Sequence, residues 1–224
     1  MYEILTGPLL WIAFAVFFVG LTVRVVLYFR GLDWRLDRVA YKPQMKYGIR
    51  GAVRSVYTWL LPFGTHGWRA KPIYTLMFFA LHIGVVIVPL FIEGHAVMIK
   101  NALGISWPAM PQILADVLAI AALIGGLGIA VRRVLLPEVR ILTNSKDMLL
   151  LGLILTLLAS GIVAAHNPAQ YSFWITLHVA CGVLVLLTAP FTRLAHIVLF
   201  FCTRIQLGMD FGIKRGGMKT NFDW

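Results

Sequence analysis

Five long apolar runs are the feature that most restricts how this 224-residue chain can fold. They occupy residues 8–29, 72–92, 113–131, 148–165 and 173–201. An α-helix rises about 1.5 Å per residue, so each run is long enough to cross a hydrocarbon core of about 30 Å. The sequence therefore predicts an all-α integral membrane protein whose single domain, residues 1–224, is a bundle of five transmembrane helices.

The composition is typical of a chain dissolved in lipid. Hydrophobic residues make up 60% and charged residues 13%, whereas soluble domains carry about 25% charged residues. The formal net charge of +11 does not indicate a nucleic-acid partner, because the basic residues lie in the connections between apolar runs, where they set topology. Cys181 and Cys202 form neither a CxxC nor a CxxCH motif, so we expect no covalent c-type haem and no iron-sulfur cluster in this chain.

The distribution of lysine and arginine predicts the orientation. The basic connection 30–71 contains Arg30, Arg35, Arg38, Lys42, Lys46, Arg50, Arg54, Arg69 and Lys71 against Asp33 and Asp37. The third connection contains Arg132, Arg133, Arg140 and Lys146, and the tail contains Arg204, Lys214, Arg215 and Lys219. The other two connections contain Lys100 alone. The positive-inside rule therefore predicts an external N-terminus and a cytoplasmic C-terminus, in the inner (cytoplasmic) membrane.

The connection 30–71 also interleaves aromatic with basic residues, among them Tyr47, Tyr57, Trp59 and Trp68. One interpretation is an amphipathic interfacial helix attracted to anionic lipid. The other is a docking surface for a cytoplasmic subunit. A single segment can serve both purposes, so both interpretations stay open.

Four of the six histidines are expected in two facing pairs. His82 and His95 are predicted on the second helix, and His178 and His196 on the fifth. Because these two helices run in opposite directions, His82 and His196 fall in the cytoplasmic half, and His95 and His178 in the outer half. Ionisable residues within spans usually mark ion, proton or cofactor paths. One histidine pair per leaflet is the arrangement that bis-imidazole ligation of b-type haem requires, with these four residues as ligands of haem iron.

The spacing between the two histidines of one helix supports this arrangement better for the fifth helix than for the second. His178 and His196 are 18 residues apart, which is five full turns, so both imidazoles are expected to point from one face of the fifth helix about 27 Å apart along its axis. His82 and His95 are 13 residues apart, which is about 19.5 Å and leaves their directions about 140° apart. Pro89 lies between them, and a proline kink can redirect one end of a helix.

Residues near the histidines have both functional and ordinary interpretations. Gly84, Gly94 and Gly182 could let a macrocycle approach the backbone, or could simply allow close helix packing. Arg193 lies three residues before His196, where it could pair with a haem propionate or extend to the interface. Each histidine taken alone could also be a hydrogen-bonded residue between helices.

Three further ionisable residues lie near the predicted membrane boundaries. His66 precedes the second span and is expected to be interfacial. His166 lies in the outer loop after the fourth helix, and Asp116 lies near the outer start of the third. His166 and Asp116 together could take protons from a quinol, a possible catalytic role, although a capped and partly exposed Asp116 is the simpler interpretation.

Several segments carry a resemblance to a known family. They are FFALHIG around His82, VRRVLLPEVRILT at 131–143, GISWPAMPQILAD ending at Asp116, and TLHVACG with PFTRLAHI in the last apolar run. The chain resembles the respiratory nitrate reductase gamma-subunit family of five-helix dihaem cytochromes b. Within that family it is most similar to the short subunits of sulfate-reducer transmembrane redox complexes, such as the high-molecular-weight cytochrome complex. The resemblance covers nearly the whole chain.

The resemblance implies a ligand set and partners. His82 and His196 would ligate an inner haem, and His178 an outer haem with a second histidine from the second helix. The family places that second histidine ten residues after the first, where this chain has Ile92, so His95 would have to substitute for it. The family also implies menaquinone exchange near the outer haem and a cytoplasmic iron-sulfur subunit near the inner one. Other membrane subunits and a periplasmic multihaem cytochrome c are further implied partners.

Three functional hypotheses follow. The first is a dihaem b-type subunit that transfers electrons across the membrane between a periplasmic or quinone donor or acceptor and the cytoplasmic iron-sulfur subunit. The second is an electron conduit with no quinone site of its own and with one haem. The third is a transporter that uses the same histidines for a metal cation, although five spans without an internal inverted repeat argue against it.

Overall fold

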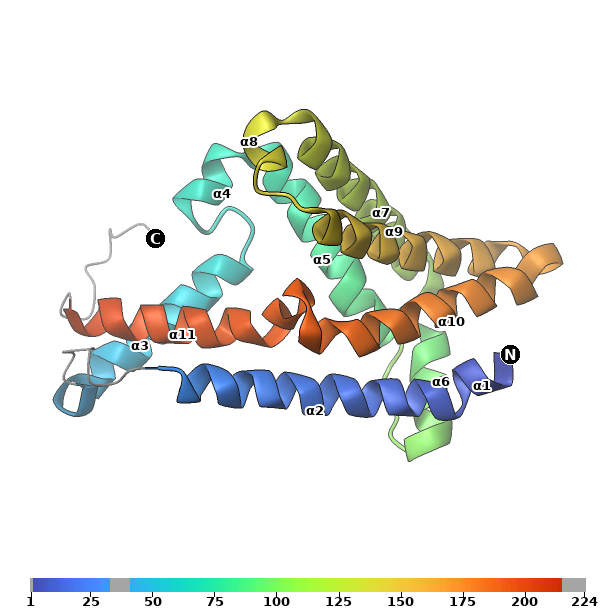
Figure 1. Ribbon diagram of the computed structural model, residues 1–224, viewed down its shortest axis with the longest axis horizontal. Coiled ribbons are helices and arrows are strands. Elements are labelled where there is room, and N and C mark those ends of the chain that lie inside the picture. Colours follow the sequence, from blue (N-terminus) through green and yellow to red (C-terminus); the bar gives the residue numbers. More distant parts are fainter. Residues whose placement is uncertain (1, 33–40, 215–224) are drawn as a thin grey trace. The chain divides into compact units, whose positions relative to one another are not determined.

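The computed structural model describes residues 2–32 and 41–214, and in these residues it contains helices and turns but no strand (Figure 1). Six helical segments are long and apolar enough to cross a membrane: Tyr2–Arg30, Pro72–Phe91, Gln112–Leu135, Ser145–His166, Pro168–Phe191 and Arg193–Ile213. The predicted class, an all-α multi-pass membrane protein, is confirmed. The predicted count of five is not confirmed, because the last apolar run is divided. Arg35, Arg38, Arg215 and Lys219 lie outside the described residues.

The chain divides into two compact units. The first unit comprises the residues up to Leu10 and Ile73–Val185, and the second comprises Trp11–Pro72 and the residues from Leu186 onward.

The first unit is a set of apolar helices that meet through small residues. It contains α1 (Tyr2–Thr6), α5 (Pro72–Phe91), α6 (Glu93–Leu103), α7 (Gln112–Leu135), α8 (Pro137–Arg140), α9 (Ser145–His166) and most of α10 (Tyr171–Thr188). A Cβ added to Gly84 would collide with the Cβ of Ala122, and one added to Gly125 would lie 2.6 Å from the carbonyl oxygen of Met77. Gly84 therefore serves close packing of α5 on α7, as small residues do in membrane helices.

The end of α5 differs from the prediction. The helix ends at Phe91, Ile92 is extended with φ −71° and ψ 138°, and α6 begins at Glu93. His95 is therefore on α6, and the prediction that it shares the second transmembrane helix with His82 is wrong. Pro89 lies inside α5, so the redirection occurs at Ile92, where the chain leaves the helix.

Partners from later in the chain hold this helix end. The last four carbonyls of an α-helix have no hydrogen-bond donor within the helix and need donors from elsewhere. The carbonyl of Val88 accepts from Ile92 N at 2.8 Å, and that of Pro89 accepts from His95 Nδ1 at 2.9 Å. The carbonyl of Leu90 accepts from Trp107 Nε1 at 2.7 Å, and that of Phe91 accepts from Met110 N at 2.8 Å. All four are satisfied, and the last two, those of Leu90 and Phe91, take their donors from the segment after α6, which folds back onto the end of α5.

The second unit contains α3 (Tyr41–Leu60), α4 (His66–Ala70), α11 (His196–Lys214) and most of α2 (Pro8–Arg30). The helix α3 lies antiparallel to α11 along a seam of glycines. A Cβ on Gly51 would collide with the carbonyl oxygen of Gly208, and one on Gly212 with that of Tyr47. At the other end of the seam, the Arg204 guanidinium lies 4.5 Å from the ring centre of Trp59. The basic connection therefore contains a helix that is packed, along one face, on α11.

The last apolar run is not one continuous helix, so the prediction of a single span over 173–201 is not confirmed. After α10 ends at Thr188, two short 3₁₀ turns, η2 (Ala189–Phe191) and η3 (Arg193–Ala195), precede α11. Pro190 cannot donate a backbone hydrogen bond, and Thr192 is extended while its hydroxyl accepts from Leu194 N at 3.3 Å. His178 lies on α10 and His196 begins α11, so the two histidines do not share one face of a single helix as predicted.

Candidate functional site

The first unit brings His95 and His178 together. His95 extends from the first turn of α6 and His178 from the middle of α10, and their ring centres are 6.0 Å apart with ring planes inclined by 27°. Both side chains are half-buried. These are the two histidines that the sequence analysis assigned to the outer half of the membrane.

The Nδ1 atom of each ring is held by a hydrogen bond to a backbone carbonyl. His95 Nδ1 donates to the carbonyl oxygen of Pro89 at 2.9 Å, and His178 Nδ1 donates to that of Leu157 at 2.9 Å. A carbonyl oxygen only accepts, so the proton of each neutral ring sits on Nδ1 and the lone pair on Nε2. Histidines that ligate metals almost always donate their other ring nitrogen in this way.

Local features of the neighbouring helices create these positions. The carbonyl of Pro89 can reach His95 only because α5 stops at Phe91. On α9, Gly161 leaves room for the imidazole of His178: a Cβ there would lie 2.8 Å from the ring atoms Cε1 and Nδ1. Sequence reasoning missed Gly161, since nothing in its own neighbourhood links it to a histidine 17 residues later.

Two of the glycines expected near the histidines border open space. A Cβ added to Gly94 would have no heavy atom within 4 Å, and one added to Gly182 would meet only the Leu157 Cδ1 atom at 3.8 Å. Gly84 differs from them because its space is filled by α7. Gly94 is exposed and precedes His95 on α6, and Gly182 lies one turn along α10 from His178.

The other two candidate histidines show the same ring hydrogen bond. His82 Nδ1 donates to the carbonyl oxygen of Phe78 at 2.7 Å, and the Phe78 ring stacks on the imidazole with centres 4.0 Å apart. His196, the first residue of α11, donates from Nδ1 to the carbonyl oxygen of Arg193 at 2.8 Å. His82 belongs to the first unit and His196 to the second, so their pairing stays a prediction.

Contacts within the second unit place His196 along the length of α2. A Cβ on Gly20 would lie 2.6 Å from the Cβ of Pro190, and the hydroxyl of Tyr28 hydrogen bonds to the side chain of Gln206. His196 comes between Pro190 and Gln206 in sequence, so it lies beside the half of α2 that ends at Arg30. The Arg193 side chain is exposed.

His166 and Asp116 meet at one end of the first unit. His166 Nε2 lies 3.3 Å from Asp116 Oδ1, and Gln112 Nε2 donates to the same oxygen at 2.8 Å. The His166 side chain is 55% exposed and that of Asp116 is 23% exposed, so the pair is open to proton exchange with water. His166 is five residues beyond Gly161 on α9, which is about 7.5 Å along the helix from the contact with His178.

The described residues offer no ligand set for a bare metal ion. Within residues 2–32 and 41–214, no group of three His, Cys, Asp or Glu side chains is arranged to hold one. Cys181 and Cys202 are buried free thiols. His66 begins α4 and is exposed. It belongs to none of the sites described above.

The fold defines a multi-pass helical membrane protein, in which a histidine of α6 meets one of α10. No family model matches the chain. A protein of Nitratidesulfovibrio vulgaris, named only "Protein", has 52% identical residues over 226 aligned positions, and the alignment covers all of both chains. The chain belongs to the same family as this protein.

Proposed function

We propose that the protein is a dihaem b-type membrane subunit that carries electrons across the inner membrane. The observation that supports this most directly is the His95 and His178 pair. A bond between a metal and an imidazole nitrogen is about 2 Å long, so two imidazoles that hold one metal must have ring centres no more than about 6 Å apart. The observed separation is 6.0 Å, and both rings carry the Nδ1 hydrogen bond that leaves Nε2 for iron.

The donor set also fits haem. A porphyrin supplies four nitrogens, so two axial histidines complete the coordination of iron, whereas a bare ion in a structural site usually takes more protein ligands. The open space beside Gly94 and Gly182 suits the approach of a macrocycle. Bound haem would supply the one-electron chemistry. The chain would hold the two imidazoles in one tautomer and orientation and keep the site within apolar helices.

A second haem would be held by His82 and His196. In support, each ring donates from Nδ1 to a backbone carbonyl, and His196 lies beside the half of α2 that ends in Arg30. With the positive-inside orientation, that half is the cytoplasmic one. Arg193, whose side chain is exposed, would pair with a propionate of this inner haem.

A menaquinone site beside the outer haem is favoured by the His166 and Asp116 pair. Oxidation of a quinol to a quinone releases two electrons and two protons. Haem held by His95 and His178 would supply the one-electron chemistry, while the imidazole of His166 and the carboxylate of Asp116 would take the protons and exchange them with water. The alternative within the same class is an electron conduit without its own quinone site. A histidine-based metal transporter has less support, because His95 and His178 are joined by no third ligand in the described part of the chain.

The partners in this proposal are a cytoplasmic iron-sulfur subunit, other membrane subunits and a periplasmic multihaem cytochrome c. The cationic face of α3, which includes Lys46 and Arg50 as exposed residues, would contribute to docking of the cytoplasmic subunit.

Haem content per polypeptide tests the proposal. The purified wild-type protein should show reduced b-type absorption bands and about two haems per chain, one for each pair of axial ligands. His95→Ala and His178→Ala should each leave about one haem and remove the same spectral component. His66→Ala, a change at an exposed histidine outside the proposed ligand set, should leave both haems. A wild-type protein without b-type bands would refute the proposal, and unchanged content in His95→Ala would remove His95 from the ligands.

A further inference from the structure

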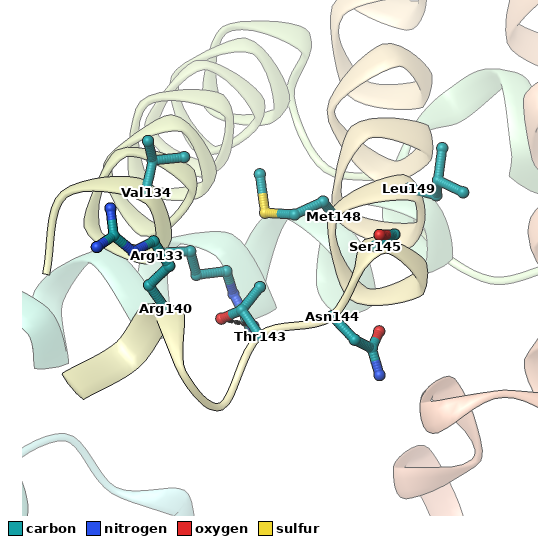
Figure 2. Close-up of a pocket in the computed structure, with 8 residues that line it drawn as sticks. All are labelled: Arg133, Val134, Arg140, Thr143, Asn144, Ser145, Met148 and Leu149. Carbon is teal, nitrogen blue, oxygen red and sulfur yellow. Dashed lines mark hydrogen bonds between the residues drawn. The ribbon is translucent and has the colours of Figure 1, made fainter. Parts of the chain in front are cut away.

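A pocket of about 570 Å³ opens between the end of α7 and the start of α9 (Figure 2). Its lining combines arginines, small polar residues and apolar side chains: Arg133, Val134, Arg140, Thr143, Asn144, Ser145, Met148 and Leu149. All of these residues lie in the first unit, and none belongs to the histidine sites or to the His166 and Asp116 pair.

Arg133 has hydrogen-bonding capacity that the chain does not use. Its Nη1 donates to the hydroxyl oxygen of Thr143 at 3.3 Å, and that hydroxyl donates to the carbonyl of Val139 at 2.8 Å. The Arg133 Nε atom is buried and has no hydrogen-bond partner among the described residues. A guanidinium has five N–H donors, and a buried donor without an acceptor costs free energy. The pocket therefore contains a cation that lacks an anion.

The charge of the pocket is not neutralised nearby. Arg140, at the end of α8, is exposed, and in the part of the chain that the structure describes neither Arg133 nor Arg140 forms an ion pair with a carboxylate. The carboxylate of Asp147 is buried and accepts from Asn144 N at 3.1 Å in the capping box of α9. Arg132 does not line the pocket, because its guanidinium lies 4.4 Å over the ring of Tyr74 on α5.

The remaining wall is apolar. The Met148 side chain extends from α9 toward α7 (Figure 2), and Val134 and Leu149 are 53% and 73% exposed. Both lie on helices that are long and apolar enough to cross a membrane. Exposed apolar side chains at the end of such helices face acyl chains, so the pocket has a cationic part and a lipid-facing part side by side.

We propose that this pocket binds an anionic phospholipid, with its headgroup phosphate at Arg133 and Arg140 and an acyl chain along Val134, Met148 and Leu149. Arginine suits phosphate because its planar fork can donate two hydrogen bonds to two oxygens. Basic pockets between membrane helices at the cytoplasmic side bind anionic headgroups. The apolar wall favours a lipid over free phosphate, which would share only the arginines. The proposal does not depend on haem binding.

Native mass spectrometry of the full chain in detergent tests the proposal, with palmitoyl-oleoyl phosphatidylglycerol as the titrated lipid. Arg140→Gln and Arg133→Gln should each weaken the tightest binding step about tenfold, the effect expected of losing one charge-assisted hydrogen bond. Lys146→Gln is the matched control, because it removes the same charge from the same connection but at an exposed residue outside the pocket lining. It should leave that step within about twofold, since exposed charges contribute little.

Two further titrations identify the ligand. Phosphatidylcholine should bind more weakly than phosphatidylglycerol, and inorganic phosphate should not displace the lipid. Equal weakening of lipid binding by Lys146→Gln and Arg140→Gln would mean that diffuse charge attraction, and not a defined site, holds the lipid. That result would overturn the proposal. Displacement by inorganic phosphate would overturn it in favour of a free-anion site. Arg140 is exposed, so its variant is expected to fold, and circular dichroism of each variant verifies this.

Discussion

Replacing Gly161 by alanine should remove the outer haem while leaving the fold intact. The added methyl would lie 2.8 Å from Cε1 and Nδ1 of His178, whereas non-bonded carbon atoms prefer about 3.5–4.0 Å. The imidazole must therefore move by roughly 1 Å, which breaks its 2.9 Å hydrogen bond to Leu157 and turns Nε2 away from iron. Overpacking of this kind costs about 1–3 kcal/mol.

The assay compares Gly161→Ala with Gly152→Ala on the same helix. A Cβ at Gly152 would have no heavy atom within 4 Å, so both variants gain the same helix propensity, about 1 kcal/mol, but only one displaces the histidine. We expect Gly152→Ala to keep the wild-type haem content and spectrum. Gly161→Ala should lose the spectral component that His178→Ala loses, or shift its reduction potential if the ligand is only tilted. A Gly161→Ala protein with wild-type haem content, spectrum and potential would refute the reasoning.

Three further predictions concern other parts of the chain. His82→Ala and His196→Ala should abolish one and the same spectral component, and loss of different components would contradict the inner pair. Trp107→Phe removes the donor to the carbonyl of Leu90, so thermal unfolding should show a free energy of unfolding lower by about 0.5–1.5 kcal/mol, and no change would mean that another donor replaces it. Reporter fusions should place Trp107 and Gln170 outside and Arg54, Glu138 and Trp224 in the cytoplasm; an external Arg54 would reverse the predicted orientation.

The sequence by itself determined the class of this protein. Hydropathy and run length are local properties, and they predicted helices over 8–29, 72–92, 113–131 and 148–165 that the structure contains with small differences at their ends. The histidine candidates also came from the sequence alone, since ionisable residues are rare in apolar runs and each one is conspicuous. Composition and run length are enough to predict these features because the free energy of moving a side chain into lipid depends mainly on that side chain.

Tertiary structure decided where the helices end and which histidines meet. The spacing of residues predicted His95 on the second helix, redirected by a kink at Pro89, but the chain leaves that helix at Ile92. That end exists because Trp107 and Met110, more than a dozen residues later, supply donors to the terminal carbonyls.

The same holds for the partner histidine and for the last apolar run. His178 takes its position from Gly161 and the carbonyl of Leu157 on another helix, and the run over 173–201 breaks at Pro190 although its hydropathy continues through it. Hydropathy measures transfer into lipid, whereas a helix end or a ring orientation depends on which donor or acceptor the folded chain brings within about 3 Å. Those partners are distant in sequence, so only the folded chain could reveal them.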